Sequence, residues 1–479
     1  MNDKYDVAII GAGIGGLVCG CYLAKAGLKV IIVEQHNKPG GYCTSFERQG
    51  YKFDVGVHYL GGVNTGFLGK VLEELNLKDQ LKVTQFDPSD KIIMPDNITY
   101  VRAKPEDTIE EFKKSFPKET KNIDTFFKFV MQNGFLNIYA KSRGLSFRAF
   151  LDKIFQDERL KATLGVLVGN IGTSEYKAAA FPCLILLSQY ILDPGYYPEG
   201  GMQKFPDILC ETIKTLGGDI ILSQKVNQII VNNRKASGII LENGNKIYAS
   251  MVVSNADARE TFSKLLDFPT KELKSVNNMQ PTPSMLLLYL GLNINLNKMM
   301  KEKCNFGYFS TYNVNRAYCD LERNVSGKKL DWIIGAVPSL HDKISNGNDS
   351  LILMIFAPYK SKAFWEENKE GLSEKMIDKF NELRVIPDLR KLIKIKVIGT
   401  PQTLQRYTLN TEGSFAGWLP TVEQTERKYL SQNSTVKNLF LAGHWCSTGY
   451  IHYGGVPNVA FLGKRASQLI KKEFKKIKT

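Results

Sequence analysis

Glycines near the N-terminus follow the spacing of a phosphate-binding turn. Gly11, Gly13 and Gly16 match the pattern G-x-G-x-x-G, with Ile14 and Gly15 inside it. Glycine allows a tight turn after a strand, close approach of the backbone to a pyrophosphate, and close packing of the helix that follows. The start of that helix offers unpaired N–H groups and a partial positive charge to the phosphates. These residues therefore predict a dinucleotide site.

The elements around the turn stand in the order that such a site needs. An apolar run at 7–10 predicts a buried strand, residues 17–26 a helix rich in small residues, and 29–33 a second strand. Glu34 ends the second strand, 18 residues after the last glycine of the turn. A carboxylate at this place accepts hydrogen bonds from ribose hydroxyls. We expect Glu34 and the neighbouring Gln35 to contact the ligand.

A second glycine pair follows the dinucleotide motif. Gly40 and Gly41 precede Thr44 and Ser45, which would supply further N–H and hydroxyl donors along an extended ligand. An NAD domain does not need this addition. Here, and through 50–59, the sequence resembles the FAD-dependent oxidoreductases of the phytoene desaturase, carotenoid isomerase and retinol saturase family, which belong with the amine oxidase-type flavoproteins.

Two later blocks extend the resemblance to the C-terminus. The first is 197–256, and the family's backbone around the residue matching Val226 contacts the adenine. The second is 413–458, where Gly443 and His444 match the turn after the last strand of the FAD domain. Many family members carry an acid at the position of His444.

The last helix of the chain completes the resemblance. Gly455 and Val456 open a helix that in the family points its start at the N1–C2=O edge of the flavin ring. The resemblance thus implies non-covalently bound FAD. The cofactor-binding residues that we expect are Gly11, Gly13, Ile14, Gly15, Gly16, Glu34, Gln35, Gly40, Gly41, Thr44, Ser45, His58, Val226, Gly443, His444, Gly455 and Val456.

The fold class that we expect is α/β. It combines a Rossmann-type FAD-binding domain, discontinuous in sequence, with an inserted α+β substrate domain of mixed sheet and helical layer. The FAD domain takes 1–70, 197–265 and 400–479, and the substrate domain takes 71–196 and 266–399. For the substrate domain the patterns predict strands in 82–102, 284–292, 306–313, 331–339 and 351–358, and helices in 106–192 and 372–394.

No strong acid–base, nucleophilic or metal-binding constellation stands out. The flavin supplies the redox step in such enzymes, so the protein mainly positions an apolar chain and excludes water. His58, Tyr450 and His452 are weak candidates for a catalytic role. Cys446 is a remote candidate for a covalent bond to flavin. The eight cysteines are too dilute for a disulfide framework, which favours a reducing cytoplasmic compartment.

Charge and hydropathy leave two questions open. The apolar run at 178–192 is shorter than the roughly 20 residues of a membrane span, so it is either a buried helical layer or the wall of a lipid tunnel. The net charge is +15, and residues 464–479 hold seven Lys or Arg and one Glu. This basic helix is either a solvated tail or a peripheral contact with an anionic membrane. No motif for nucleic acid accompanies it.

Three functions follow from these patterns. The first is an FAD enzyme that desaturates, isomerises or saturates carbon–carbon bonds of a polyene or isoprenoid lipid. The second is an FAD-dependent amine or porphyrinogen oxidase. The third is a non-catalytic prenyl-lipid binding protein of the same fold, which the intact cofactor motifs disfavour. The residues identify neither the substrate nor the electron donor or acceptor.

Overall fold

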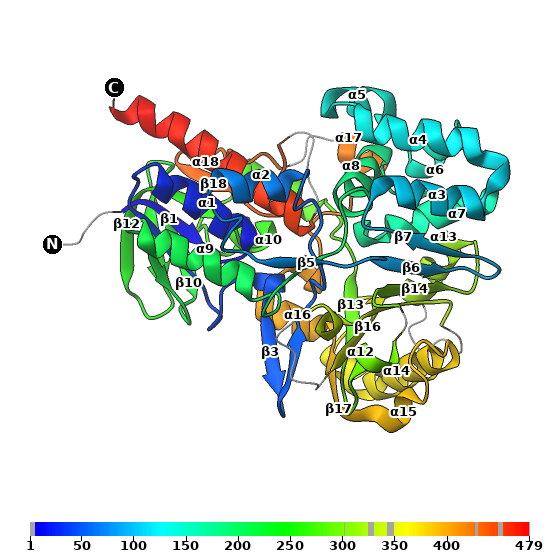
Figure 1. Cartoon of the computed structure of the whole chain (residues 1–479). Helices are drawn as coiled ribbons and strands as arrows, with labels where there is room; N and C mark the ends of the chain where they lie inside the picture. The colour runs from blue at the N-terminus through cyan, green and yellow to red at the C-terminus, as the bar shows by residue number, and fades with distance from the viewer. Residues whose placement is uncertain are drawn as a thin grey trace.

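The computed structural model describes residues 5–300, 302–323, 330–342, 349–426, 430–448 and 454–478. Figure 1 shows one sheet with α18 at the left, a helical layer at the upper right and a second sheet at the lower right. The α/β fold class predicted from the sequence is confirmed. The residue boundaries predicted for the two domains stay predictions.

The first sheet has a parallel centre in the order β18-β12-β1-β2-β9. Alternate residues of β1 enter two different apolar clusters, Val7 and Ile9 one and Ala8 and Ile10 the other. Both faces of the sheet are therefore covered, which explains the unbroken apolar run. The strands of this sheet are β1 (Tyr5–Ile10), β2 (Val30–Val33), β9 (Asp219–Ile221), β10 (Val226–Asn232), β11 (Lys235–Leu241), β12 (Lys246–Ser254) and β18 (Leu439–Leu441).

Helices cover one face of this sheet, and an antiparallel extension enlarges the sheet itself. β10, β11 and β12 pair antiparallel, with Gly244 at φ 85° in the turn between β11 and β12. The helix α1 (Ile14–Lys25) packs between α9 (Lys204–Thr215) and α18 (Val456–Lys478). The last helix begins at Val456, at the place that the sequence predicts, and runs to Lys478.

The second sheet is mixed and has the order β17-β13-β16-β15-β14-β6-β7. Only the pair of β6 and β14 is parallel; the other described pairs are antiparallel. Its strands are β6 (Asp90–Ile93), β7 (Ile98–Val101), β13 (Ser284–Leu292), β14 (Asn305–Phe309), β15 (Trp332–Ala336), β16 (Ser350–Ala357) and β17 (Ile393–Gly399).

The prediction of helix in 372–394 is correct in part: it covers the second half of α14 and all of α15, but it misses the first half of α14 and the start of β17. The helix α14 spans Lys362–Glu382, and its N-cap Ser361 accepts a hydrogen bond from the N–H of Phe364. The charged residues between 366 and 370 interrupt the apolar pattern of its buried side, which includes Trp365 and Phe380. The sequence pattern therefore does not mark the first turns of this helix. A short helix, α15 (Leu389–Leu392), then leads directly into β17, which the sequence pattern missed.

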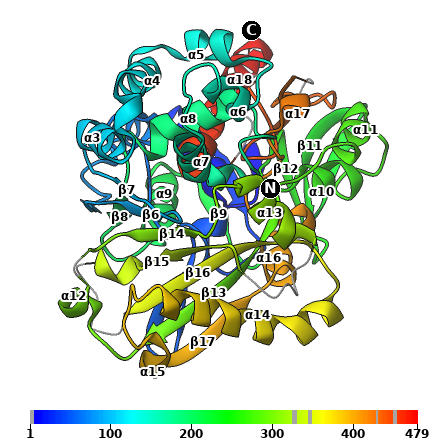
Figure 2. The same ribbon diagram turned by 90° about the vertical axis from the view of Figure 1, so that its right-hand side faces the viewer.

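A layer of helices lies on the β7 side of the second sheet, above it in Figure 2. Its members are α3 (Pro105–Ser115), α4 (Thr120–Gln132), α5 (Phe135–Ser142), α6 (Phe147–Leu151), α7 (Glu158–Leu167) and α8 (Ala180–Tyr190). All of α8 except Ser188 is buried, in agreement with a buried helical layer. Within the described ranges, no helix is both long and apolar enough to cross a membrane.

Shorter elements connect these three layers. They are β3 (Ser45–Arg48), β4 (Tyr51–Asp54), β5 (Val83–Gln85), β8 (Tyr196–Pro198), α2 (Phe67–Glu74), α10 (Ala258–Ser263), α11 (Lys271–Asn277), α12 (Leu296–Met299), α13 (Val314–Arg323), α16 (Pro401–Thr408) and α17 (Val422–Glu426). The hairpin of β3 and β4 packs on the second sheet through Phe53 and Tyr289, so it joins the two sheets beside the first glycine turn.

Candidate cofactor site

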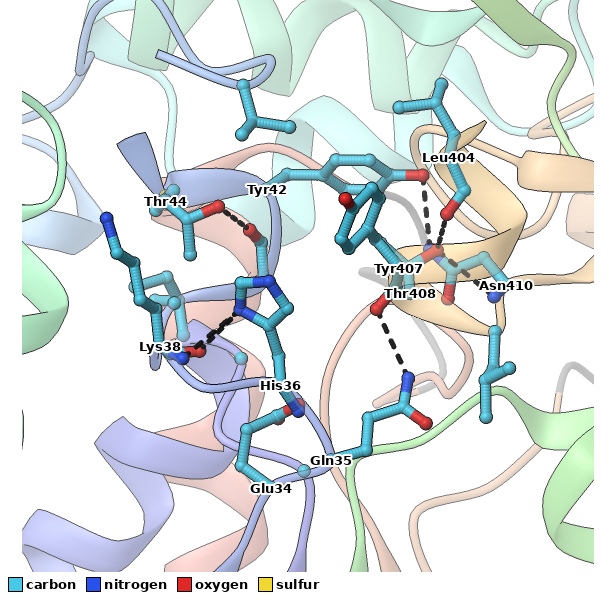
Figure 3. A pocket seen from close by; sticks show the side chains of 18 of the residues that line it. Glu34, Gln35, His36, Lys38, Tyr42, Thr44, Leu404, Tyr407, Thr408 and Asn410 are labelled. Atoms are coloured by element: carbon cyan, nitrogen blue, oxygen red, sulfur yellow. Dashed lines mark hydrogen bonds between the residues drawn. The ribbon is translucent and has the colours of Figure 1, made fainter. Parts of the chain in front are cut away.

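A cavity of about 1190 Å³ opens at the carboxyl ends of β1 and β2. Its walls come from the glycine turn, the loop after β2, the segment 40–48, α16 and the start of α18. Figure 3 shows part of this wall, with Tyr42 and Asn410 on one side and His36 and Lys38 on the other. The cavity exceeds the range of about 300–1,000 Å³ for drug-sized ligands, as an extended dinucleotide requires.

The glycine turn holds the end of β1 close against the start of α1. Gly11 has φ +92°, and a Cβ on Gly16 would lie 2.3 Å from Gly11 O. This contact is the close helix–strand packing that the motif predicts. Gly16 itself does not line the cavity, whereas Gly11, Gly13, Ile14 and Gly15 do. The first N–H groups of α1 therefore face the cavity at the helix start, where an anion is stabilised.

Glu34 is fixed at the end of β2 by two backbone donors. Its Oε2 accepts a hydrogen bond from Ala12 N over 2.7 Å, and its Oε1 accepts one from His36 N over 2.8 Å. Burial raises the pKa of Glu34, and these bonds oppose that rise. A carboxylate has about four acceptor positions, so two remain for hydroxyl groups of a ligand. Glu34 and Gln35 both line the cavity.

The second glycine pair reaches the cavity, but the hydroxyls after it are used within the protein. Gly40 N donates to Ala12 O over 2.8 Å, which holds this loop against the first turn. Thr44 Oγ1 donates to Gly41 O over 2.9 Å, and Ser45 Oγ donates to Asp54 Oδ1 over 2.6 Å. Both hydroxyls thus have acceptors within the protein, and the expectation that they donate to a ligand stays a prediction. All four predicted residues line the cavity.

The far end of the cavity lies at the start of β10. Val226 lines it together with Ser223, Lys225 and Leu265. The position agrees with the expectation that the backbone near Val226 contacts an adenine. The expectation itself stays a prediction.

The sequence patterns did not identify α16 as part of this wall. Gln35 Nε2 donates to Tyr407 O over 3.2 Å, and the rings of His36 and Tyr407 meet edge to face at 5.5 Å (Figure 3). Tyr42 Oη donates to Ser414 O over 2.8 Å. These contacts close the cavity between segments more than 360 residues apart. No local signal in the sequence marks them.

Asn255 is a second site residue that the patterns missed. It follows β12 and lies against Gly11, Gly13, Gly15 and Gly443, and its Nδ2 donates to Gly11 O over 3.4 Å. Its Oδ1 is buried without a hydrogen-bond partner in the described part of the chain. The sequence offered one signal for this residue, its position directly after a strand. The carboxyl ends of neighbouring parallel strands meet at the same edge of a sheet, where the glycine turn also lies.

The C-terminal block supplies the opposite wall. Gly443 has φ +78° and lies beside Asn255, and His444 follows it in the cavity wall. Burial lowers the pKa of His444 to about 4, so its imidazole is neutral at neutral pH. Gly455 and Val456 also line the cavity, at the start of α18.

The remaining candidates have less to do with the cavity. His58 does not line it; its Nδ1 lies 3.3 Å from Gly56 O, and burial lowers its pKa to about 4. Tyr450 and His452 lie outside the described residues. Cys446 does not line the cavity either, and its buried thiol donates to Gly443 O over 3.3 Å. Burial raises the pKa of this thiol to about 12.

The residues present fit FAD on two structural observations. The cavity joins a glycine turn, which suits phosphates, to a carboxylate that retains free acceptor positions, which suits a ribose. The cavity also extends to the start of α18. Between the glycine turn and this helix start, Asn255 Oδ1 offers an acceptor without a hydrogen-bond partner in the described ranges. Among the described residues, no group of three His, Cys, Asp or Glu side chains is arranged to hold a metal ion.

Comparison with protein families matches residues 14–471 to the family described as flavin containing amine oxidoreductase. All-trans-retinol 13,14-reductase of Danio rerio is 25% identical over 92% of this chain and 82% of its own length. Prolycopene isomerase of Daucus carota is 27% identical over 96% of this chain and 79% of its own length. 4,4'-diapolycopen-4-al dehydrogenase of Metabacillus indicus is 26% identical over 95% of this chain and 94% of its own length.

Solved structures share the fold. An oxidoreductase from Methanosarcina mazei superposes with a TM-score of 0.70 at 18% identity, over 97% of this chain and 100% of that one. Wild-type putrescine oxidase bound to putrescine superposes with a TM-score of 0.66 at 15% identity, over 98% of this chain and 99% of that one. At these identities the likeness is one of fold alone.

Proposed function

The chain belongs to the family of flavin containing amine oxidoreductases, and we propose that it is an FAD-dependent oxidoreductase acting on carbon–carbon bonds of an apolar polyene or isoprenoid lipid. The observation that carries the cofactor is the single cavity that unites the glycine turn, Glu34 and the start of α18. The relatives that support the substrate class are the retinol reductase, the prolycopene isomerase and the diapolycopenal dehydrogenase.

We assign the binding roles along the cavity from one end to the other. Val226 lies at the adenine, Glu34 accepts from the ribose hydroxyls, and the first turn of α1 faces the pyrophosphate. The start of α18 lies at the ring, where the helix dipole stabilises negative charge. When bound, FAD supplies hydride transfer at its N5. The cofactor is held without a covalent bond in this proposal, because Cys446 is buried outside the cavity wall.

The chain's own part in the reaction is to hold an apolar substrate and keep water out. The helical layer and the second sheet share one large apolar cluster, which includes Phe181, Leu184 and Leu187 of α8. Exclusion of water strengthens each electrostatic contact near the ring. His444 is half-buried and neutral, so it serves as a wall of the cavity and not as a positive charge.

We also propose that the protein works in the cytoplasm, in peripheral contact with membranes that hold its lipid substrate. The support is the outer end of α18, where Lys472, Lys475 and Lys476 are exposed. Such a cluster is attracted to anionic lipid. Sedimentation with anionic vesicles but not with neutral vesicles is expected, and equal sedimentation with both would contradict the contact.

The visible absorption spectrum of the purified protein tests the main proposal. Flavin bands, overlaid by the structured bands of a retained polyene, are expected, with all the flavin released by acid precipitation. A colourless protein that takes up no added FAD would refute an FAD enzyme. Flavin that an amine bleaches in the absence of oxygen, and whose bands return as oxygen is admitted and consumed, would instead favour an amine oxidase.

A further inference from the structure

A tyrosine from the helical layer holds the start of α18. Val456 N donates a hydrogen bond to Tyr190 Oη over 3.1 Å. Tyr190 is the last residue of α8 and is 8% exposed. The first N–H groups of a helix lack partners within the helix. One of those groups at the wall of the cofactor cavity is therefore already satisfied by a phenol oxygen.

The phenol lies next to the exposed backbone of Gly455, which lines the cavity. A Cβ on Gly455 would lie 3.4 Å from Tyr190 Oη and 3.7 Å from Asn458 Nδ2. Asn458 is 1% exposed, and its Oδ1 has no hydrogen-bond partner in the described ranges. Both polar side chains thus lie directly behind Gly455, which lines the cavity, and Asn458 Oδ1 is an unmet polar atom there.

The hydroxyl hydrogen of Tyr190 has no hydrogen-bond acceptor among the described residues. A phenol oxygen that accepts from an N–H still has its own O–H to donate. The structure gives this hydrogen no acceptor among the described residues, although the group is buried. Burial raises the pKa of Tyr190 well above its usual range, against a smaller opposing effect of the Val456 N–H. The phenol therefore remains a neutral donor at every pH at which the protein is used.

We propose that Tyr190 donates this hydrogen to the N1–C2=O edge of the bound flavin. The inference rests on the proposed function, because it needs FAD in the cavity with its ring at the start of α18. A fixed neutral donor stabilises negative charge at that edge. Because Tyr190 belongs to the helical layer, this hydrogen bond would link the substrate side of the protein directly to the cofactor.

The test compares Tyr190→Phe with Tyr59→Phe in the FAD-loaded protein. Tyr59 is a matched control, because it is 5% exposed and its ring meets that of Tyr190 edge to face at 5.6 Å. Its hydroxyl makes no hydrogen bond to the described part of α18. Two properties of the bound flavin are measured: its affinity for sulfite, by absorbance, and its midpoint potential, against reference dyes.

Loss of one hydrogen bond to a charged group predicts about tenfold weaker sulfite binding in Tyr190→Phe. The same factor lowers the midpoint potential by about 30 mV for a two-electron couple. Tyr59→Phe is expected to leave both values unchanged. If Tyr190→Phe binds FAD with wild-type sulfite affinity and potential, the inference is overturned while the proposed function stands.

A merely structural role of Tyr190 has a different outcome. Both variants would then lose FAD and thermal stability to a similar extent, while the flavin that remains keeps its sulfite affinity and potential. That result would also overturn the inference. A wild-type protein that binds no FAD would overturn the inference together with the proposed function, so the two failures are distinguishable.

Discussion

Gly15→Ala tests how closely three segments of the chain meet at the cofactor site. A Cβ at this position would lie 2.7 Å from Asn255 Oδ1 and 2.7 Å from Gly443 N. The asparagine side chain is able to rotate, but the backbone of Gly443 is not. The methyl group therefore has to displace the turn after β18, which forms one wall of the cavity.

The magnitude follows from two opposing effects. Overpacking by one methyl group in a tight interior costs about 1–3 kcal/mol, and the contact with the rigid backbone of Gly443 puts this site in the upper part of that range, at about 2–3 kcal/mol. Alanine in place of glycine within a helix stabilises the helix by about 1 kcal/mol, which opposes this cost. The net loss is about 1–2 kcal/mol. If the displaced turn passes this cost to the cofactor site, FAD binds roughly 5- to 30-fold more weakly, since 1.4 kcal/mol is a factor of ten.

Titration of the apoprotein with FAD, followed by the quenching of flavin fluorescence, measures this loss. Gly371→Ala is the matched control, because Gly371 also lies within a helix, α14, and a Cβ there would meet nothing within 4 Å. Its FAD affinity should equal that of the wild type, and its stability should be equal or higher by up to about 1 kcal/mol. A Gly15→Ala protein with wild-type FAD affinity and melting temperature would refute the reasoning.

Three further predictions follow from the site. Glu34→Gln should bind FAD about tenfold more weakly, because the amide loses charge-assisted bonds; an unchanged dissociation constant would contradict the role of Glu34. Stability should fall as the pH drops from about 6.5 to 4, because the folded protein holds His58 and His444 neutral with pKa values of about 4 while the unfolded chain protonates them. Each histidine contributes a loss of about 3 kcal/mol, and urea unfolding of His444→Gln should show a shallower pH dependence than the wild type. Cys446→Ser should retain flavin that acid releases completely, as in the wild type; flavin that stays bound only in the wild type would demonstrate a covalent bond.

The sequence was most informative where the signal is local. The glycine turn, its two strands and Glu34 lie within one short stretch, and their order alone predicts a dinucleotide site. The structure brings these residues to one cavity with Val226, Gly443 and Gly455, although their contacts with FAD stay a prediction. The apolar run in α8 is buried, as both a helical layer and the wall of a lipid tunnel require, because a run without charged residues avoids water in either case.

The sequence was least informative where charges obscure the buried side of an element. The helix α14 begins ten residues earlier than predicted, because charged residues separate Trp365 from the next buried positions. The strand β17 alternates Ile and Lys over 393–396, which is the period of a strand, but the predicted helical segment extended to 394 and so missed its start. In both cases the packing against the second sheet decides the structure.

Tertiary structure alone decided which distant residues complete the site. Asn255 reaches the glycine turn because β12 lies parallel to β1 and ends at the same edge. Tyr407 reaches Gln35, and Tyr190 reaches Val456, across 372 and 266 residues of chain. Such contacts depend on strand order and on how the layers pack, and the hydrophobic period of a segment carries no information about either. The sequence by itself thus determined the kind of ligand, and the fold determined which side chains surround it.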